Sequence, residues 1–320
     1  MTDEAPRVLL AATRTRRGFL RLAAGGVAAA LLGCQSVARG AVLPEVTKRS
    51  AAASAPRLQE VVAPTATPRP VPAEGRYARP MLPGTPWETP LYLNHSGRQG
   101  ATVLVLGGVH GNEPGGWLAA EEVAGWMPTF GSLLVIPRAN LLATRMMERT
   151  TAELGDLNRL YPGAPDAPAP MARMAFAILE VAREFGATVL LDMHESWAFY
   201  AERAQNGTAF LGQTIGAGRG PEGDTLARHL ADRANVEVGV RRDLFWTRDQ
   251  LPLPGAVQPP PSSGAPRPAG ISRSSLGAGE YVAGLTPVLV EMGQMDQSIS
   301  RRVDLHVLVA RVLLQSRGMI

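Results

Sequence analysis

Residues 101–127, ATVLVLGGVHGNEPGGWLAAEEVAGWM, contain a strand-like run, a glycine-rich connection and a helix-like run in succession. The first part, 101–106, is a short β-branched and apolar run typical of a buried strand, and 117–127 spaces its apolar residues like a helix. Between the two, His110 and Glu113 stand among glycines. This connection is either a polar turn, since Gly, Asn and Pro favour turns, or the first part of a metal site.

Most of the chain after residue 89 repeats this alternation of strand and helix. Buried strands alternating with helices predict an α/β domain with a largely parallel sheet covered on both faces. The other strands are expected at 132–137, 187–192 and 286–290, and the other helices at 171–185, 226–234 and 302–315.

Polar side chains follow the predicted strands where ligand sites of such sheets gather, at the carboxyl ends. His194 follows the strand at 187–192, and Glu291 follows the strand at 286–290. Two His and one Glu are a known ligand set for catalytic zinc. The ion lowers the pKa of water, a carboxylate can take the proton, and an arginine can stabilise the developing oxyanion.

Four separated segments carry a resemblance to a known family. GGVHGNE, DLNRLYPG, LLDMHES and LVEMG are similar in order and spacing to the succinylglutamate desuccinylase/aspartoacylase family, which belongs with the zinc carboxypeptidases. The resemblance extends from about residue 101 to the C-terminus. It implies a mixed sheet between helices, and it makes the polar-turn interpretation of the first segment much weaker.

The resemblance implies a metal site and a proton-transfer group. His110 and Glu113 match the first two ligands of one zinc ion, and His194 matches the third. Glu291 matches the glutamate that acts as general base and acid.

The resemblance also implies residues that bind substrate. Asn158 and Arg159 match the pair that holds a substrate carboxylate. Arg149 lies near the position of the arginine that polarises the scissile carbonyl, with Arg145 as the second candidate.

The remaining histidines and one long insertion suggest no chemistry. His95 lies in a turn-like segment, and His229 and His306 lie on predicted helices, so surface or packing roles are expected. The Pro/Ser/Gly-rich segment 252–270 is either disordered or a lid over the pocket.

The N-terminus carries an export signal. Paired arginines within TRRGFLR, residues 15–21, resemble the twin-arginine signal, and the apolar run that follows is 12 residues, shorter than the roughly 20 of a membrane span. Cys34, the only cysteine, ends a stretch like the lipoprotein cleavage site, so lipidation there is expected. An ordinary secretory signal is the alternative. The predicted organisation is a signal peptide at 1–33, an Ala/Pro-rich tether at 34–88 and a hydrolase domain at 89–320.

The distribution of charge argues against nucleic-acid binding. The formal charge is +4, and most of it comes from the N-terminal arginines, so we do not expect the folded domain to bind nucleic acid.

The sequence as a whole predicts an envelope-facing, lipid-anchored zinc hydrolase that cleaves an amide bond next to a free carboxylate, as an N-acyl amino-acid deacylase. A zinc carboxypeptidase acting on envelope peptides and a non-catalytic ligand-binding surface lipoprotein are the alternatives.

Overall fold

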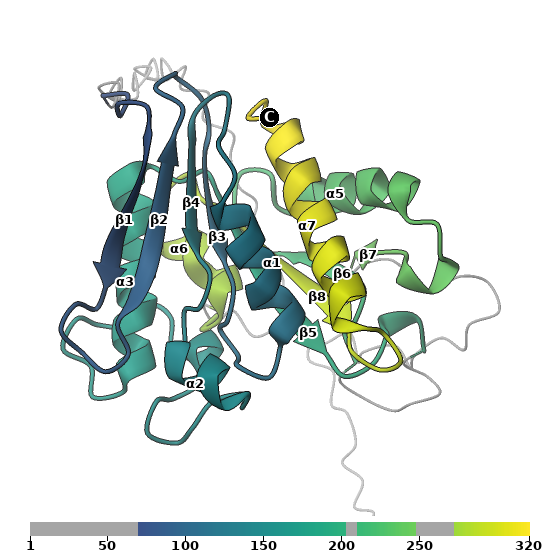
Figure 1. Ribbon diagram of the computed structural model, residues 1–320, viewed down its shortest axis with the longest axis horizontal. Helices are drawn as coiled ribbons and strands as arrows, with labels where there is room; N and C mark the ends of the chain where they lie inside the picture. The colour runs from purple at the N-terminus through teal and green to yellow at the C-terminus, as the bar shows by residue number, and fades with distance from the viewer. Residues whose placement is uncertain (1–69, 203–209, 248–271) are drawn as a thin grey trace, which may run out of the picture. The chain divides into compact units, whose positions relative to one another are not determined.

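An eight-stranded sheet organises the protein in the computed structural model, which describes residues 70–202, 210–247 and 272–320 (Figure 1). The strand order is β1-β2-β4-β3-β5-β8-β6-β7. The strands are β1 (Gly75–Met81), β2 (Thr89–His95), β3 (Thr102–Leu106), β4 (Ser132–Ile136), β5 (Val189–Ser196), β6 (Thr214–Ala217), β7 (Trp246–Thr247) and β8 (Thr286–Gly293).

The centre of the sheet is parallel and its edges are mixed. β4, β3, β5 and β8 run parallel to one another, while β1, β2 and β6 pair in the antiparallel sense with their inner neighbours. The parallel strands therefore end at one edge of the sheet. The predicted α/β class with a mixed, largely parallel sheet is confirmed.

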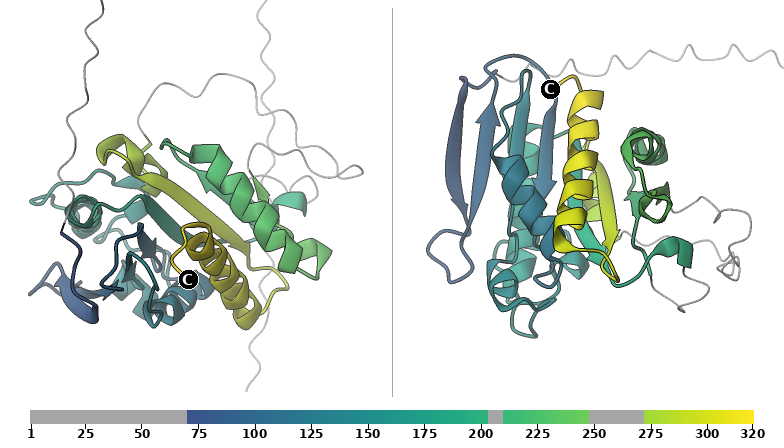
Figure 2. Two further views of the ribbon diagram at one scale, coloured as in Figure 1. Left: turned by 90° about the horizontal axis from the view of Figure 1, so that it is seen from above. Right: turned by 45° about the vertical axis from the view of Figure 1, so that its right-hand side comes forward.

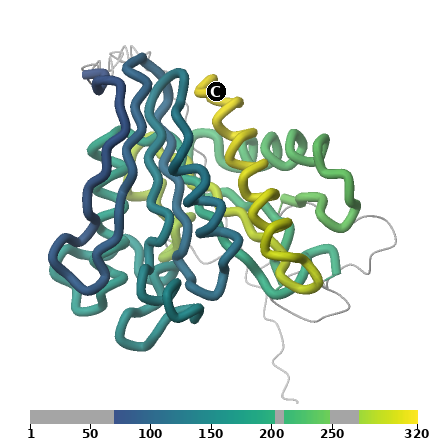
Figure 3. The backbone as a smooth tube through the Cα atoms, in the orientation of Figure 1, coloured from purple at the N-terminus to yellow at the C-terminus, as the bar shows by residue number. Residues whose placement is uncertain are grey.

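Helices cover both faces of the sheet (Figure 2). The α-helices are α1 (Pro114–Ala124), α2 (Leu141–Met146), α3 (Pro170–Phe185), α5 (Gly223–Glu237), α6 (Ala278–Tyr281) and α7 (Ile299–Ser316), and the 3-10 helices are η1 (Leu157–Arg159), η2 (Tyr200–Glu202), η3 (Arg241–Asp243) and η4 (Ser275–Gly277). α1 and α7 lie side by side on one face, as the backbone trace also shows (Figure 3).

Each central strand buries both of its faces, because its side chains alternate between two cores. Val103 and Leu191 join a core with α1, α5 and α7, which we call the α1/α7 face. Leu104 and Leu190 join the other core with α3, which we call the α3 face. Residues two apart on β5 therefore share a face.

The folded part begins earlier than the sequence predicted, because β1 lies inside the segment 34–88 that was expected to be a tether. β1 pairs with β2 along its whole length, from Gly75 opposite His95 to Met81 opposite Thr89. It is an edge strand with mostly exposed side chains, so it lacks the apolar alternation that identifies a strand, and Pro80 is tolerated there because edge strands leave some backbone groups unpaired.

Several predictions lie outside the described residues. These are the export signal, Cys34, the tether up to residue 69 and the segment 252–270. Within the described ranges, no helix has both the length and the apolar character required to cross a membrane.

Candidate metal centre and active site

One loop and one strand bring the three predicted metal ligands together. His110 and Glu113 lie in the connection between β3 and α1, and His194 lies within β5 near its carboxyl end. The Nδ1 atom of His110 is 2.7 Å from Oε1 of Glu113, and Nδ1 of His194 is 2.9 Å from Oε2 of the same carboxylate. The two Nδ1 atoms are 3.1 Å apart. All three side chains are buried.

These residues fit a zinc ion. Ligand atoms bound tetrahedrally at about 2.1 Å from zinc are about 3.4 Å apart, and one ligand atom from each of the three residues lies within 4.8 Å of the others. The second nitrogen of each imidazole contacts a carboxylate, Asp156 at 3.1 Å for His110 and Asp192 at 2.9 Å for His194. Zinc-binding histidines usually have such a partner, which fixes the tautomer and the ring orientation.

The electrostatics of this cluster favour charged carboxylates. Burial opposes ionisation of Glu113, but His110 and His194 outweigh it and hold the pKa of this carboxyl well below its usual range. Burial also acts against ionisation of Asp156, and the contact with His110 lowers its pKa nonetheless. The pKa of His194 is raised well above its usual value, because Asp192 and Glu113 outweigh the effect of burial.

The register of the sheet places Glu291 beside the cluster. In the parallel pairing of β5 with β8, Glu291 lies opposite His194, so the two side chains point to the same face of the sheet. Glu291 is half-buried, as expected for a group that must meet both substrate and solvent. This placement agrees with the predicted proton-transfer role.

Arg149, and not Arg145, contacts the cluster. Nη1 of Arg149 is 3.4 Å from Oε1 of Glu113, and Nη2 is 3.3 Å from Oδ2 of Asp156. About half of the Arg149 side chain remains exposed, whereas Arg145 is an exposed residue of α2. The geometry favours Arg149 as the arginine available to a reacting carbonyl.

The DLNR segment forms η1 beside the cluster. Asp156 caps η1 by accepting a hydrogen bond from the backbone N–H of Asn158 at 3.0 Å, while its carboxylate also contacts His110. Asn158 is buried and its Oδ1 accepts from the backbone N–H of Ser275 at 3.0 Å. Arg159 is exposed, with Nη1 donating to the carbonyl oxygen of Asn158 at 2.7 Å. The arginine predicted to bind a carboxylate thus stands at the solvent side of this segment.

Sequence reasoning missed a group of polar residues behind the metal cluster. Glu195 is buried on the α1/α7 face and pairs with Arg302 of α7. Burial raises the pKa of Glu195 to about 7, although Gln294 and Arg302 act in the opposite direction. The only sequence signal was the position of Glu195 directly after His194.

The other histidines lie at surface or packing positions, as expected, and one detail is corrected. His95 is not in a turn but ends β2, where Nδ1 lies 2.8 Å from Oγ of Ser132. His306 is buried on α7, and burial lowers the pKa of its imidazole to about 3. His229 is exposed on α5.

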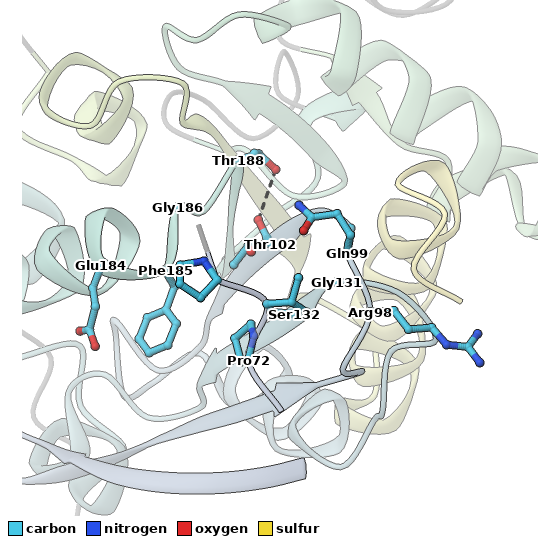
Figure 4. A pocket seen from close by; sticks show the side chains of 13 residues that line it. Pro72, Arg98, Gln99, Thr102, Gly131, Ser132, Glu184, Phe185, Gly186 and Thr188 are labelled. Atoms are coloured by element: carbon cyan, nitrogen blue, oxygen red, sulfur yellow. Dashed lines mark hydrogen bonds between the residues drawn. The ribbon is translucent and has the colours of Figure 1, made fainter. Parts of the chain in front are cut away.

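A pocket of about 670 Å³ lies away from the metal cluster (Figure 4). Thr102, Ser132 and Thr188 line it at the amino ends of β3, β4 and β5, whereas His110 and His194 lie near the carboxyl ends. The pocket contains no histidine. It is therefore separate from the candidate active site.

The mixed sheet with helices on both faces is an α/β fold, and its His–Glu–His cluster is a group that could hold a metal ion. Residues 99–198 match the family described as Succinylglutamate desuccinylase/Aspartoacylase catalytic domain. The segment that contains His110, Glu113 and His194 is therefore similar to this family, and the resemblance seen in the sequence is confirmed. No curated protein matches the chain.

Solved structures share the fold at low sequence identity. The Cell Shape Determinant protein Csd4 from Helicobacter pylori is 16% identical with a TM-score of 0.54, covering 69% of this chain and 52% of its own. An aspartoacylase family protein from Mesorhizobium loti is 17% identical with a TM-score of 0.52, covering 79% and 70%. The ectoine utilization protein EutE (DoeB) from Ruegeria pomeroyi is 19% identical with a TM-score of 0.51, also covering 79% and 70%. This chain spans about half the length of Csd4.

Proposed function

We propose that the protein is a zinc-dependent hydrolase that cleaves an amide bond next to a free carboxylate, acting as an N-acyl amino-acid deacylase. The observation that carries this proposal is the buried cluster of His110, Glu113 and His194 at the carboxyl edge of the sheet. The match of residues 99–198 to a catalytic-domain family supports it.

The metal ion and the surrounding side chains have different roles in this proposal. His110, Glu113 and His194 would hold the zinc ion, which would supply Lewis-acid chemistry and lower the pKa of a water molecule. Glu291, on the same face as His194, takes the proton of the attacking water and delivers it to the leaving nitrogen. Arg149 stabilises the negative charge that develops on the carbonyl oxygen.

The substrate carboxylate is bound next to this centre. Arg159 is exposed and carries a planar guanidinium, which suits bidentate binding of a carboxylate. Asn158 is fixed by Ser275 and by the cap from Asp156, so the segment that carries Arg159 is held in place. A substrate lacking a free carboxylate would lose this contact.

A carboxypeptidase acting on peptides of the cell envelope is the second candidate. One structure of Csd4 is described as an mDAP-bound D,L-carboxypeptidase, and another contains a tripeptide. The same proposed residues serve both reactions, because each cleaves an amide bond near a carboxylate. The predicted export signal and a lipid on Cys34 would place this chain in the envelope, where such peptides occur.

A substrate screen of the zinc-loaded full chain tests the proposal. Acylated amino acids and short peptides are compared, and hydrolysis of the first group identifies a deacylase while hydrolysis of peptides alone identifies a carboxypeptidase. Absence of stoichiometric zinc, together with no hydrolysis of either group, would favour the non-catalytic lipoprotein.

Glu291→Gln then tests the mechanism. This variant should abolish turnover and leave zinc content unchanged, because the amide cannot accept the proton. Glu237→Gln, at an exposed position of α5, makes the same change far from the cluster and should retain activity. Turnover retained in Glu291→Gln would exclude this residue as the base.

A further inference from the structure

The residue that starts α1 is a proposed metal ligand and does not cap its own helix. Glu113 is the N-cap residue of α1, yet its side chain accepts no hydrogen bond from the first turn, because it points into the metal cluster. The first helical residue is Pro114, which has no N–H, so Gly115 supplies the first free backbone donor. Helix ends leave such donors unsatisfied unless another group accepts them.

Glu195 supplies the missing acceptor from another strand. Its Oε1 accepts a hydrogen bond from the backbone N–H of Gly115 at 3.0 Å. A carboxylate at this position is also favoured by the positive end of the helix dipole. A Cβ on Gly115 would lie 2.1 Å from Oε1 of Glu195, and one on Gly116 would lie 2.5 Å from the carbonyl oxygen of Met193. The two glycines therefore permit the helix to approach β5 this closely.

The other oxygen of Glu195 holds the residues on the opposite side of the ligand. Its Oε2 accepts from Nε2 of Gln294 at 3.0 Å and pairs with Arg302. Nε2 of Gln294 also donates to the carbonyl oxygen of Asn112 at 2.9 Å. The backbone is thus fixed at Asn112 and at Gly115, one residue before and two residues after Glu113.

Glu195 also contacts the ligand directly through its backbone. Its N–H donates to Oε2 of Glu113 at 2.9 Å. The Glu113 carboxylate is therefore oriented by the main chain of Glu195 and positioned by its side chain. Both contacts come from the residue next to His194, so the two ligands are fixed relative to each other.

We propose that Glu195 is a positioning residue for the metal site, which sets the place of Glu113 by capping α1 from β5. This inference rests on the proposed function, because it requires that Glu113 bind a metal. Arg302 neutralises the buried carboxylate and contributes mainly to stability. The acceptor oxygen towards Gly115 is what the metal site needs.

A pair of double variants separates these two contributions. Glu195→Gln/Arg302→Met and Glu195→Met/Arg302→Met both lack the ion pair and keep similar side-chain volumes, but only the first keeps an oxygen that can accept from Gly115. Zinc affinity of the full chain is measured by competition with a chelator. The zinc affinity of Glu195→Gln/Arg302→Met should fall by less than about tenfold. The zinc affinity of Glu195→Met/Arg302→Met should fall about 10- to 100-fold, the usual cost of removing a partner of a metal ligand.

Several outcomes would overturn the inference. Equal losses in the two double variants, or no loss in either, would show that the acceptor towards Gly115 does not position Glu113. If the Met variant fails to fold, Gln294→Met provides the second test, because it removes the contact with Asn112 from a half-buried position, and unchanged zinc affinity there would also contradict the inference. A wild-type chain that binds no zinc would instead overturn the proposed function itself.

Discussion

The two faces of β5 at its carboxyl end differ in what their side chains do. On the α3 face, His194 belongs to the candidate metal site and Asp192 contacts its imidazole. On the α1/α7 face, Met193 lies against α1 and Glu195 binds the start of that helix. Because strand side chains alternate, adjacent residues can contribute to the proposed metal site on one face and anchor α1 on the other without occupying the same space.

The largest effect is expected when the α3 face loses its proposed metal ligand. His194→Ala should lower zinc affinity by more than the roughly 100-fold that loss of an outer partner can cost, because one of three ligands is removed. Zinc competition and activity of the same preparation measure this. His229→Ala, at an exposed position of α5, should leave both unchanged. If His194→Ala and His229→Ala changed zinc affinity and activity to a similar extent, the metal-binding role proposed for His194 on the α3 face would be wrong.

A smaller effect is expected from the residue that orients His194. Asp192→Asn keeps the shape but weakens the contact of 2.9 Å with Nε2 of His194, so zinc affinity should fall about 10- to 100-fold. Asp232→Asn on the exposed side of α5 is the matched control. An unchanged zinc affinity would mean that the tautomer of His194 is set by another group.

A substitution on the α1/α7 face should mainly lower the free energy of unfolding. Gly116→Ala places a Cβ 2.5 Å from the carbonyl oxygen of Met193, and such overpacking costs about 1 to 3 kcal/mol of unfolding free energy. Gly239→Ala, where a Cβ meets no atom within 4 Å, should be close to neutral. Denaturant unfolding of the metal-free chain measures the difference, and equal stabilities would show that α1 can move away from β5.

The smallest effect is expected at Tyr161 in the core of the α3 face. Within the described residues its hydroxyl is buried without a hydrogen-bond partner, and burial raises the pKa of this group, with the charge of Asp192 adding to the effect. Tyr161→Phe removes an unsatisfied group, so unfolding free energy should change by less than about 1 kcal/mol. A loss of several kcal/mol would reveal a partner for the hydroxyl.

The central strands and the candidate metal site could be predicted from the sequence, because buried parallel strands are apolar runs and their polar residues follow at the carboxyl ends. His110, Glu113 and His194 were found in this way. β1 could not be found, because an exposed edge strand has no apolar period. Glu195 and Arg302 are 107 positions apart, and only the packing of α7 against β5 and α1 reveals their pairing.

The contacts between residues 273–275 and the DLNRLYPG segment bear on how this chain can vary. The carbonyl oxygen of Arg273 accepts from the backbone N–H of Tyr161 at 3.1 Å, and the N–H of Ser275 donates to Asn158. On the 273–275 side both contacts use main-chain atoms, so they do not depend on which side chains occupy these positions. Sequence drift before η4 can therefore accumulate without loosening the segment that carries Arg159, and related chains should differ there in composition while keeping the same anchoring.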